Sequence, residues 1–174
     1  MITSTLTDCE LLINNITNLG FPNCTFETIG EFLSLLDISY RPSIITISGT
    51  NGKGSTLLAL SHFFSYNHID YIAHSSPHFN NFNERVIHNA YSISDLDLRA
   101  LLIKIYTACH HLQLRINYYQ VGFLCACLHM QGQRPKWLIL EVGIGGRLDP
   151  ANYFDADIAI ITYVGLDHMD ILGD

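Results

Sequence analysis

Apolar residues recur along this chain with two different periods, which predict strands and helices in alternation. Short apolar runs of strand length lie at 43–48, 71–74, 136–142 and 157–162. Apolar residues at helical spacing predict helices at 9–19, 25–36, 55–66, 94–112 and 118–130. The last two strands are apolar on both faces, as buried strands are. We therefore predict an α/β fold with a mostly parallel sheet and helices on both faces.

The composition indicates one folded domain. Of 174 residues, 48% are hydrophobic, and neither a repeat nor a charged linker marks a domain boundary. The net charge of -7, with only nine Lys and Arg, argues against a nucleic-acid partner. The start of the chain has no basic segment before an apolar run, and no later run is long enough for a bilayer. We therefore expect a cytoplasmic protein without a membrane partner.

Cysteine spacing gives no sign of a metal site or a disulfide framework. The five thiols are an odd number without any C-x-x-C spacing, and they belong to Cys9, Cys24, Cys109, Cys125 and Cys127. Several lie inside apolar runs. This favours buried reduced thiols, with metal ligation or disulfides as the alternative.

A glycine-rich turn between the first strand and the helix that follows is the strongest candidate site. Residues 49–56 have the sequence GTNGKGST. The glycines let backbone N–H groups face an anion, the helix presents its positive end, and Lys53 adds a charge for phosphates. This predicts an ATP or GTP site, although Ile47 replaces the first glycine of the usual pattern and Gly54 follows the lysine. The alternative is an ordinary glycine turn.

Polar motifs follow the other three predicted strands. They are SSPH at 75–78, Glu141 running into GIGGRLD at 143–149, and GLDH at 165–168. Carboxyl ends of parallel strands meet at one edge, so these motifs should converge with the glycine turn. A carboxylate that ends an apolar run needs a cation, which beside a nucleotide predicts magnesium for Glu141. An ion pair with Arg147 is the alternative.

Histidines divide into two groups. Surface or helix-packing positions are expected for His62, His68, His110, His111 and His129. His168 differs because it follows an apolar strand and adjoins Asp167 in a turn that contains glycine. From the residues alone, a ligand role for His168 and a structural role stay equally open.

Together these motifs resemble the dihydrofolate synthase/folylpolyglutamate synthase family, and they stand in family order. They read ISGTNGKGS at 47–55, SSPH at 75–78 with NER at 83–85, LEVGIGGRLD at 140–149, and GLDHMDILGD at 165–174. The lysine followed by glycine and serine distinguishes this family from the related Mur ligases of cell-wall synthesis. The resemblance implies a P-loop NTPase-like fold and an ATP-dependent ligase that joins L-glutamate to dihydropteroate or a reduced folate through an acyl phosphate.

The resemblance also implies roles for individual residues. It implies a nucleotide site at Thr50, Asn51, Gly52, Lys53, Gly54 and Ser55. It implies magnesium ligands at Ser55, Ser76, Glu141 and His168, and a catalytic set of Lys53, Glu141 and His168. It places the pterin substrate on Asn117, Tyr118, Tyr119, Gln120, Leu148, Asp149 and Pro150. ATP and Mg²⁺ are the implied cofactors.

Two positions depart from the family pattern, and a large part of the family's length is absent from this sequence. Gln120 stands where an acidic residue is usual, and Pro150 alters the substrate turn. We expect residues 1–174 to be a partial N-terminal ATP-binding domain, truncated before the C-terminal domain and weak or inactive alone. The missing domain could come from a separate chain. The alternatives are a nucleotide- or pterin-binding remnant without ligase activity, and a P-loop kinase or GTPase.

Overall fold

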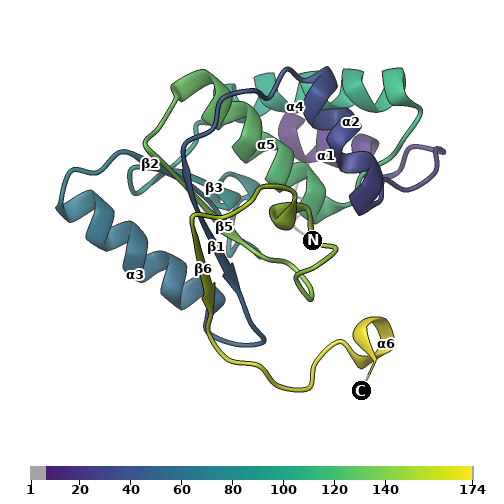
Figure 1. Ribbon diagram of the computed structural model, residues 1–174. Coiled ribbons are helices and arrows are strands. Elements are labelled where there is room, and N and C mark those ends of the chain that lie inside the picture. Colours follow the sequence, from purple (N-terminus) through teal and green to yellow (C-terminus); the bar gives the residue numbers. More distant parts are fainter. Residues whose placement is uncertain (1–6, 174) are drawn as a thin grey trace, which may run out of the picture.

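The fold is built on one six-stranded sheet. The computed structural model describes residues 7–173. The strands are β1 (Ser43–Ser48), β2 (Tyr71–His74), β3 (Val86–His88), β4 (Tyr91–Ser92), β5 (Trp137–Glu141) and β6 (Ile158–Ile161). They lie in the order β4-β3-β2-β5-β1-β6 (Figure 1). Neighbours among β2, β5, β1 and β6 run parallel, whereas β3 and β4 are antiparallel. The mostly parallel α/β sheet predicted from the sequence is confirmed.

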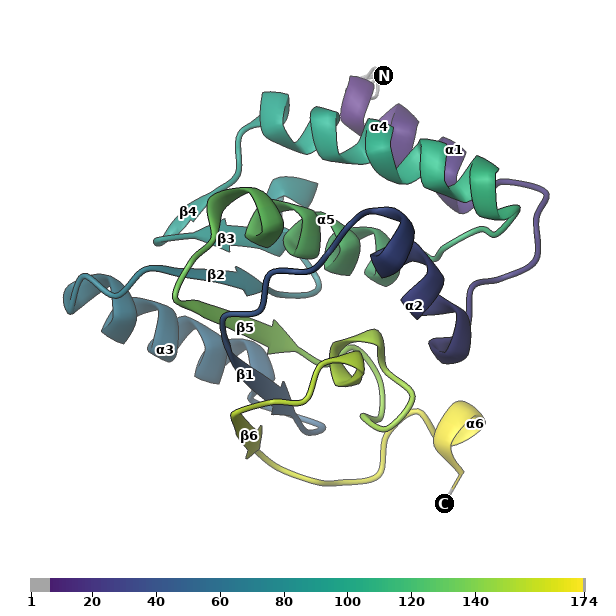
Figure 2. The same ribbon diagram turned by 45° about the horizontal axis from the view of Figure 1, so that its top comes forward.

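Helices cover the two faces unequally. The α-helices are α1 (Asp8–Thr17), α2 (Phe26–Leu35), α3 (Lys53–Tyr66), α4 (Asp95–Leu112), α5 (Tyr118–Gln133) and α6 (Met169–Leu172). Two short 3-10 helices are η1 (Phe82–Arg85) and η2 (Pro150–Tyr153). Figure 2 shows α3 on one face of the sheet and α5 on the other, with α4 and α1 outside α5. The α5 side therefore has two helical layers and the α3 side one.

Helix α5 lies at the centre of the larger layer. Every residue from Gln120 to Met130 is buried, because α5 is enclosed between the sheet and α4. Gly122 makes close packing on β2 possible, since a Cβ at this position would lie 2.8 Å from Cε1 of His74. Close packing here holds the first turn of α5 against the carboxyl end of β2.

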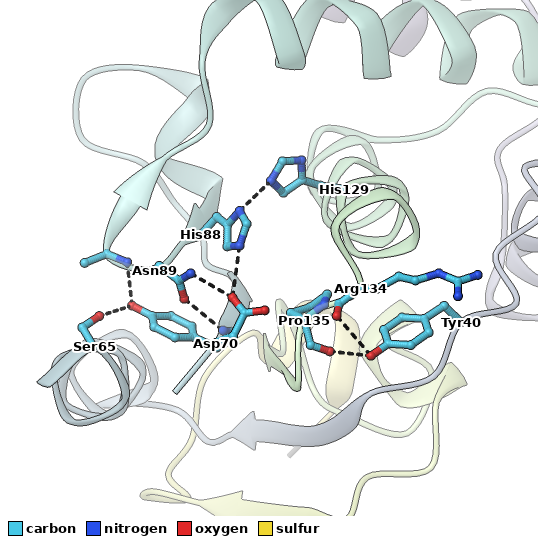
Figure 3. A network of polar contacts seen from close by, with 10 residues as sticks. Tyr40, Ser65, Asp70, His88, Asn89, His129, Arg134 and Pro135 are labelled. Carbon is cyan, nitrogen blue, oxygen red and sulfur yellow. Dashed lines mark hydrogen bonds and ion pairs between the residues drawn. The ribbon is translucent and has the colours of Figure 1, made fainter. Parts of the chain in front are cut away.

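The hairpin of β3 and β4 is absent from the sequence prediction. Both strands are too short to show a period, and their position depends on a polar network (Figure 3). In it, His88 lies 3.3 Å from Asp70 and 3.3 Å from His129, and Asn89 donates to Asp70 at 2.8 Å. The helix-packing role expected for His129 is confirmed by this contact with β3.

Strand β6 is less covered than its sequence predicts. It pairs with β1 along one edge, but Ile158 is 45% exposed and Ile161 is 70% exposed. Neither α3 nor α5 extends over β6, as Figures 1 and 2 show. Within the described residues, β6 is thus an unpaired edge with exposed apolar surface. The prediction that β6 is buried on both faces is wrong.

Two further expectations concern the chain as a whole. All five cysteines are free and buried, so the prediction of reduced thiols is confirmed. Among the helices in residues 7–173, none combines the length and the hydropathy needed to cross a membrane.

Candidate functional site

The turns that follow β1, β2, β5 and β6 line one open cleft of about 780 Å³. From the predicted set, the cleft is lined by Thr50, Asn51, Gly52, Lys53, Gly54, Ser76, Asn117, Tyr118, Tyr119, Gln120, Glu141, Leu148, Asp149, Pro150 and His168. Ser55 is the exception: α3 begins at Lys53 rather than at Ser55, and the Ser55 side chain is exposed outside the cleft lining. The convergence predicted from strand order is therefore present for every candidate except Ser55.

The glycine turn has the backbone of an anion-binding loop. Gly49 and Gly52 have φ angles of 137° and 87°, a region that other residues rarely adopt. Gly52 caps α3, so the first N–H groups of a 14-residue helix face the cleft. Lys53 Nζ donates to the carbonyl of Gly49 at 2.6 Å. The lysine thus lies folded over the turn, where it can exchange a carbonyl partner for a phosphate.

The segment that follows β6 stabilises this glycine turn through hydrogen bonds. Thr50 N donates to the carbonyl of Tyr163 at 2.6 Å, and Thr50 Oγ1 donates to the carbonyl of Gly165 at 3.0 Å. Thr162 Oγ1 donates to the carbonyl of Asn51 at 2.6 Å. These bonds fix the loop shape before any ligand binds, which lowers the entropic cost of binding.

Glu141 is a buried carboxylate in which one of the two oxygens accepts hydrogen bonds. It is 3% exposed, and its Oε2 accepts from Ser75 Oγ at 2.7 Å and from Ser76 N at 3.0 Å. Its Oε1 accepts no hydrogen bond from the described residues and lies 3.6 Å from where a Cβ on Gly54 would be. The predicted alternative, an ion pair with Arg147, is not present in residues 7–173. An oxygen directed at the glycine turn suits a hard cation such as Mg²⁺.

His168 lines the same cleft from the opposite turn. It has a φ of 49° at the start of α6, and its Nε2 lies 3.9 Å from Asp167 Oδ2. Lys53 and His168 also line a smaller cavity of about 150 Å³ beside the cleft. Within residues 7–173, no three His, Cys, Asp or Glu side chains cluster as a metal site. A site with few protein ligands, such as Glu141 and His168, fits Mg²⁺, which usually keeps waters and phosphate oxygens as its other ligands.

Two predicted substrate residues, Tyr119 and Asp149, also connect the elements of the far wall. Tyr119 OH lies 2.8 Å from both the carbonyl of Glu141 and Asp149 Oδ1, and its single proton is donated to one of these acceptors at a time. Gly143 N donates to Asp149 Oδ2 at 2.9 Å. Burial raises the pKa of Tyr119 well above its usual value and also raises the pKa of Asp149. Tyr119 is therefore a neutral donor that ties α5 to the turn after β5.

Gln120 has a structural explanation in this chain. Its Oε1 accepts from Asn117 N at 2.8 Å, and its Nε2 donates to the carbonyl of Cys24 at 3.2 Å. An amide can satisfy both bonds, whereas a carboxylate could not donate the second. Tyr118 and Leu148 are 38% and 56% exposed and leave apolar surface open in the cleft.

Four further residues line the cleft without a predicted role in the site: Cys24, Thr25, Phe26 and Arg85. The first three lie at the start of α2, about ninety positions before α5, and the tertiary contact of Cys24 with Gln120 brings them here. Arg85 belongs to the NER motif at 83–85, but the motif alone does not reveal that this residue lines the cleft.

A glycine turn at a helix N-terminus, a lysine and a buried carboxylate at the carboxyl edge of a parallel sheet define an α/β protein of the P-loop nucleotide-binding class. No protein-family model matches the chain. Dihydrofolate synthase/folylpolyglutamate synthase of Escherichia coli is 36% identical over 132 residues, which are 76% of this chain and 31% of that protein.

Solved structures agree with this match. E. coli FolC in complex with DHPP and ADP has a TM-score of 0.85 at 29% identity, covering 97% of this chain and 41% of that one. A bifunctional folylpolyglutamate synthase/dihydrofolate synthase with Mn, AMPPNP and L-glutamate bound has a TM-score of 0.76 at 30% identity, covering 94% and 39%. The chain belongs to the dihydrofolate synthase/folylpolyglutamate synthase family. It spans about a third of the length of the curated relatives it matches.

Proposed function

We propose that this chain provides the ATP- and magnesium-binding part of a ligase that joins L-glutamate to dihydropteroate or a reduced folate. One observation carries the proposal: the Glu141 carboxylate, buried and without a cationic partner in the part of the chain that the structure describes, shares a cleft with Lys53 and the glycine turn. Relatives of the same fold bind ADP, AMPPNP with Mn, and L-glutamate. We assign residues 1–174 to an N-terminal ATP-binding domain of such a ligase.

In this proposal, the backbone of Thr50 to Gly54 and the Lys53 ammonium hold the triphosphate. Ser76, Glu141 and His168 hold magnesium, which when bound would neutralise charge on the phosphoryl group that is transferred. The predicted metal role of Ser55 lacks the support of cleft geometry. ATP phosphorylates the substrate carboxylate, and the glutamate amine then displaces phosphate from the acyl phosphate. The chain's own part is to position charge, since no protein nucleophile is required.

We extend the same proposal to the pterin substrate, the glutamate site and the cellular location. The pterin substrate would lie along the far wall, where Tyr118 and Leu148 expose apolar surface next to Pro150. A glutamate site requires further structure, supplied by the same polypeptide or by a separate chain. A cytoplasmic location fits a reaction that consumes ATP. The competing function, a nucleotide- or pterin-binding remnant, would keep the binding and lack the ligation.

Calorimetric titration with ATP, with and without magnesium, tests the proposal. We expect Lys53→Ala to weaken magnesium-ATP binding by about 1–3 kcal/mol, because a charge-assisted contact to phosphate is lost. We expect Glu141→Gln to remove the gain in affinity that magnesium gives. Lys104→Ala, at an exposed position of α4, is the matched control for lost charge.

Unchanged magnesium-ATP affinity in Lys53→Ala would show that the glycine turn is not the phosphate site. A glutamate-dependent phosphate-release assay with dihydropteroate, run with the C-terminal domain of a relative added as a separate chain, then separates the ligase, which gains release, from the remnant, which does not. Release by this chain alone would contradict the expectation that it is weak or inactive in isolation.

A further inference from the structure

Arg85 is a nearly buried arginine on the wall of the cleft. It is 7% exposed and ends η1, between the turn after β2 and strand β3. Its guanidinium lies over two aromatic rings, 5.3 Å from the centroid of Phe82 and 4.9 Å from that of Tyr118. Its Nε donates to His78 Nδ1 at 3.0 Å. The side chain is therefore held on three sides.

Among the described residues, no carboxylate is paired directly with this guanidinium, although Glu141 acts on its pKa from a distance. Within residues 7–173, no carboxylate forms an ion pair with Arg85, and Nη1 and Nη2 donate to no protein acceptor. In the same residues, the buried polar atoms that lack a partner are Thr46 Oγ1, Ser61 Oγ and His74 Nε2. The Nη atoms are not among them, so they are not sealed in the core, and Arg85 is one of the residues that line the cleft.

Burial without a counter-ion is costly for a cation. Desolvation lowers the pKa of Arg85 from its usual value, although the guanidinium remains charged at any ordinary pH. This chain thus keeps a charge in a partly desolvated wall of the cleft, where the protein without ligand gains little from it. An anionic ligand that enters the cleft would supply the missing partner.

The backbone of Arg85 is fixed to the same strand end that holds Glu141. Its carbonyl accepts from Ser75 N at 3.1 Å and from His74 Nδ1 at 3.0 Å. Ser75 Oγ in turn donates to Glu141. The guanidinium therefore has a fixed position relative to the Glu141 carboxylate, which is assigned to magnesium. It lies on the side where Phe82 and Tyr118 pack.

We propose that Arg85 binds the carboxylate of the acceptor substrate, the aromatic acid that is phosphorylated, through its two Nη groups. This inference rests on the proposed function and names the residue that recognises the reacting group. Lys53 and the glycine turn already serve the phosphates, whereas Tyr118, which lines the cleft beside Arg85, offers an aromatic ring that suits a benzoate. A planar guanidinium matches a carboxylate with two parallel hydrogen bonds. Arg85 would hold that carboxylate facing the phosphate loop.

Binding of 7,8-dihydropteroate and of its methyl ester to the full chain tests this role. The ester keeps the pterin and the ring but carries no charge. We expect the wild type to prefer the acid by roughly 10- to 100-fold, the range for a charged hydrogen bond. Arg85→Gln should lose this preference by weakening acid binding alone. Arg85→Lys should keep part of it, and Arg99→Gln, exposed on α4, should keep all of it.

Separate measurements of acid, ester and magnesium-ATP binding distinguish the possible outcomes. Ester binding and magnesium-ATP binding that match the wild type show that a variant is folded. A preference for the acid that persists in Arg85→Gln overturns the role of Arg85. Weaker magnesium-ATP binding with an unchanged acid preference also overturns it, since Arg85 would then contact phosphate. A wild type that binds neither magnesium-ATP nor pterin overturns the proposed function itself.

Discussion

His74 is completely buried at the end of β2, and its two ring nitrogens have opposite surroundings. Nδ1 lies 3.0 Å from the carbonyl of Arg85, and Nε2 has no partner among residues 7–173. A carbonyl only accepts, so Nδ1 carries the proton and the ring is neutral. Burial lowers the pKa of His74 from 6.5 to about 4. One neutral imidazole thus positions the backbone of a cleft arginine.

Acid should destabilise the fold through His74. Below pH 6.5 the unfolded chain binds a proton that the folded chain excludes until pH falls to about 4. The stability is therefore complete above pH 6.5 and is lost as pH falls from 6.5 to 4. Between pH 7.5 and 4.5 we expect the wild type to lose about 2–3 kcal/mol more unfolding free energy than His74→Gln. Urea unfolding at both pH values measures the difference.

The control for this prediction is His62→Gln, which removes an exposed histidine from α3. It should show the acid sensitivity of the wild type. Equal pH dependence in His74→Gln and the wild type would mean that the imidazole accommodates a proton when folded.

At this scale the sequence predicts some of the site and not the rest. Glu141 ends β5, Lys53 begins the helix after β1 and His168 lies in the turn after β6, so strand order brings them to one edge. Arg85 and Cys24 reach the cleft through η1 and through a contact with α5. Such contacts join residues that no local pattern relates. Tyr119 was assigned to the substrate, but its hydroxyl is occupied by Glu141 and Asp149.

Among the elements, α5 depends on one glycine and is indifferent to another. Gly122 has no room for a Cβ against His74, whereas a Cβ on Gly132 would have no neighbour within 4 Å. Both lie in the same helix. The pair separates steric packing on β2 from the intrinsic cost of glycine in a helix.

We expect Gly122→Ala to lower the free energy of unfolding by about 1–3 kcal/mol, because α5 must move away from β2. Gly132→Ala should leave stability unchanged or raise it by about 0.5–1 kcal/mol, since alanine favours the helix. Urea unfolding of the two variants at neutral pH gives both values. Gly122→Ala should also weaken pterin binding, because Tyr118 to Gln120 begin the same helix. A stable Gly122→Ala would show that His74 can shift.

The predicted helices and strands are confirmed where the apolar pattern extends over many residues. All four parallel strands and the five longer helices lie within a few residues of the expected ranges. The sequence does not predict the hairpin of Val86–His88 and Tyr91–Ser92, because three and two residues show no alternation and because Asp70 positions it from outside through His88 and Asn89. The start of α3 was placed too late because Gly52 adopts a left-handed cap that only the structure reveals.

The molecule as a whole is covered unevenly from one sheet edge to the other. At the β4 edge a short hairpin packs near α4 and η1, whereas β6 lies bare at the other edge. Large apolar side chains are exposed there, at Ile158, Ile161, Tyr163, Val164 and Leu166. A sequence pattern tells that β6 is apolar, but it does not tell whether a helix covers it.

An exposed apolar edge strand favours self-association, because its free N–H and C=O groups and its side chains can pair with another copy. We expect this chain to associate as its concentration rises, and Ile161→Lys to reduce that association. Ile161 is 70% exposed, so a lysine there adds charge without opening a core cavity. Ile103→Lys, on the exposed face of α4, makes the same change in charge away from the edge. Light scattering over a concentration series compares the three proteins. If Ile103→Lys disperses the chain as well as Ile161→Lys does, net charge rather than the β6 edge controls its association.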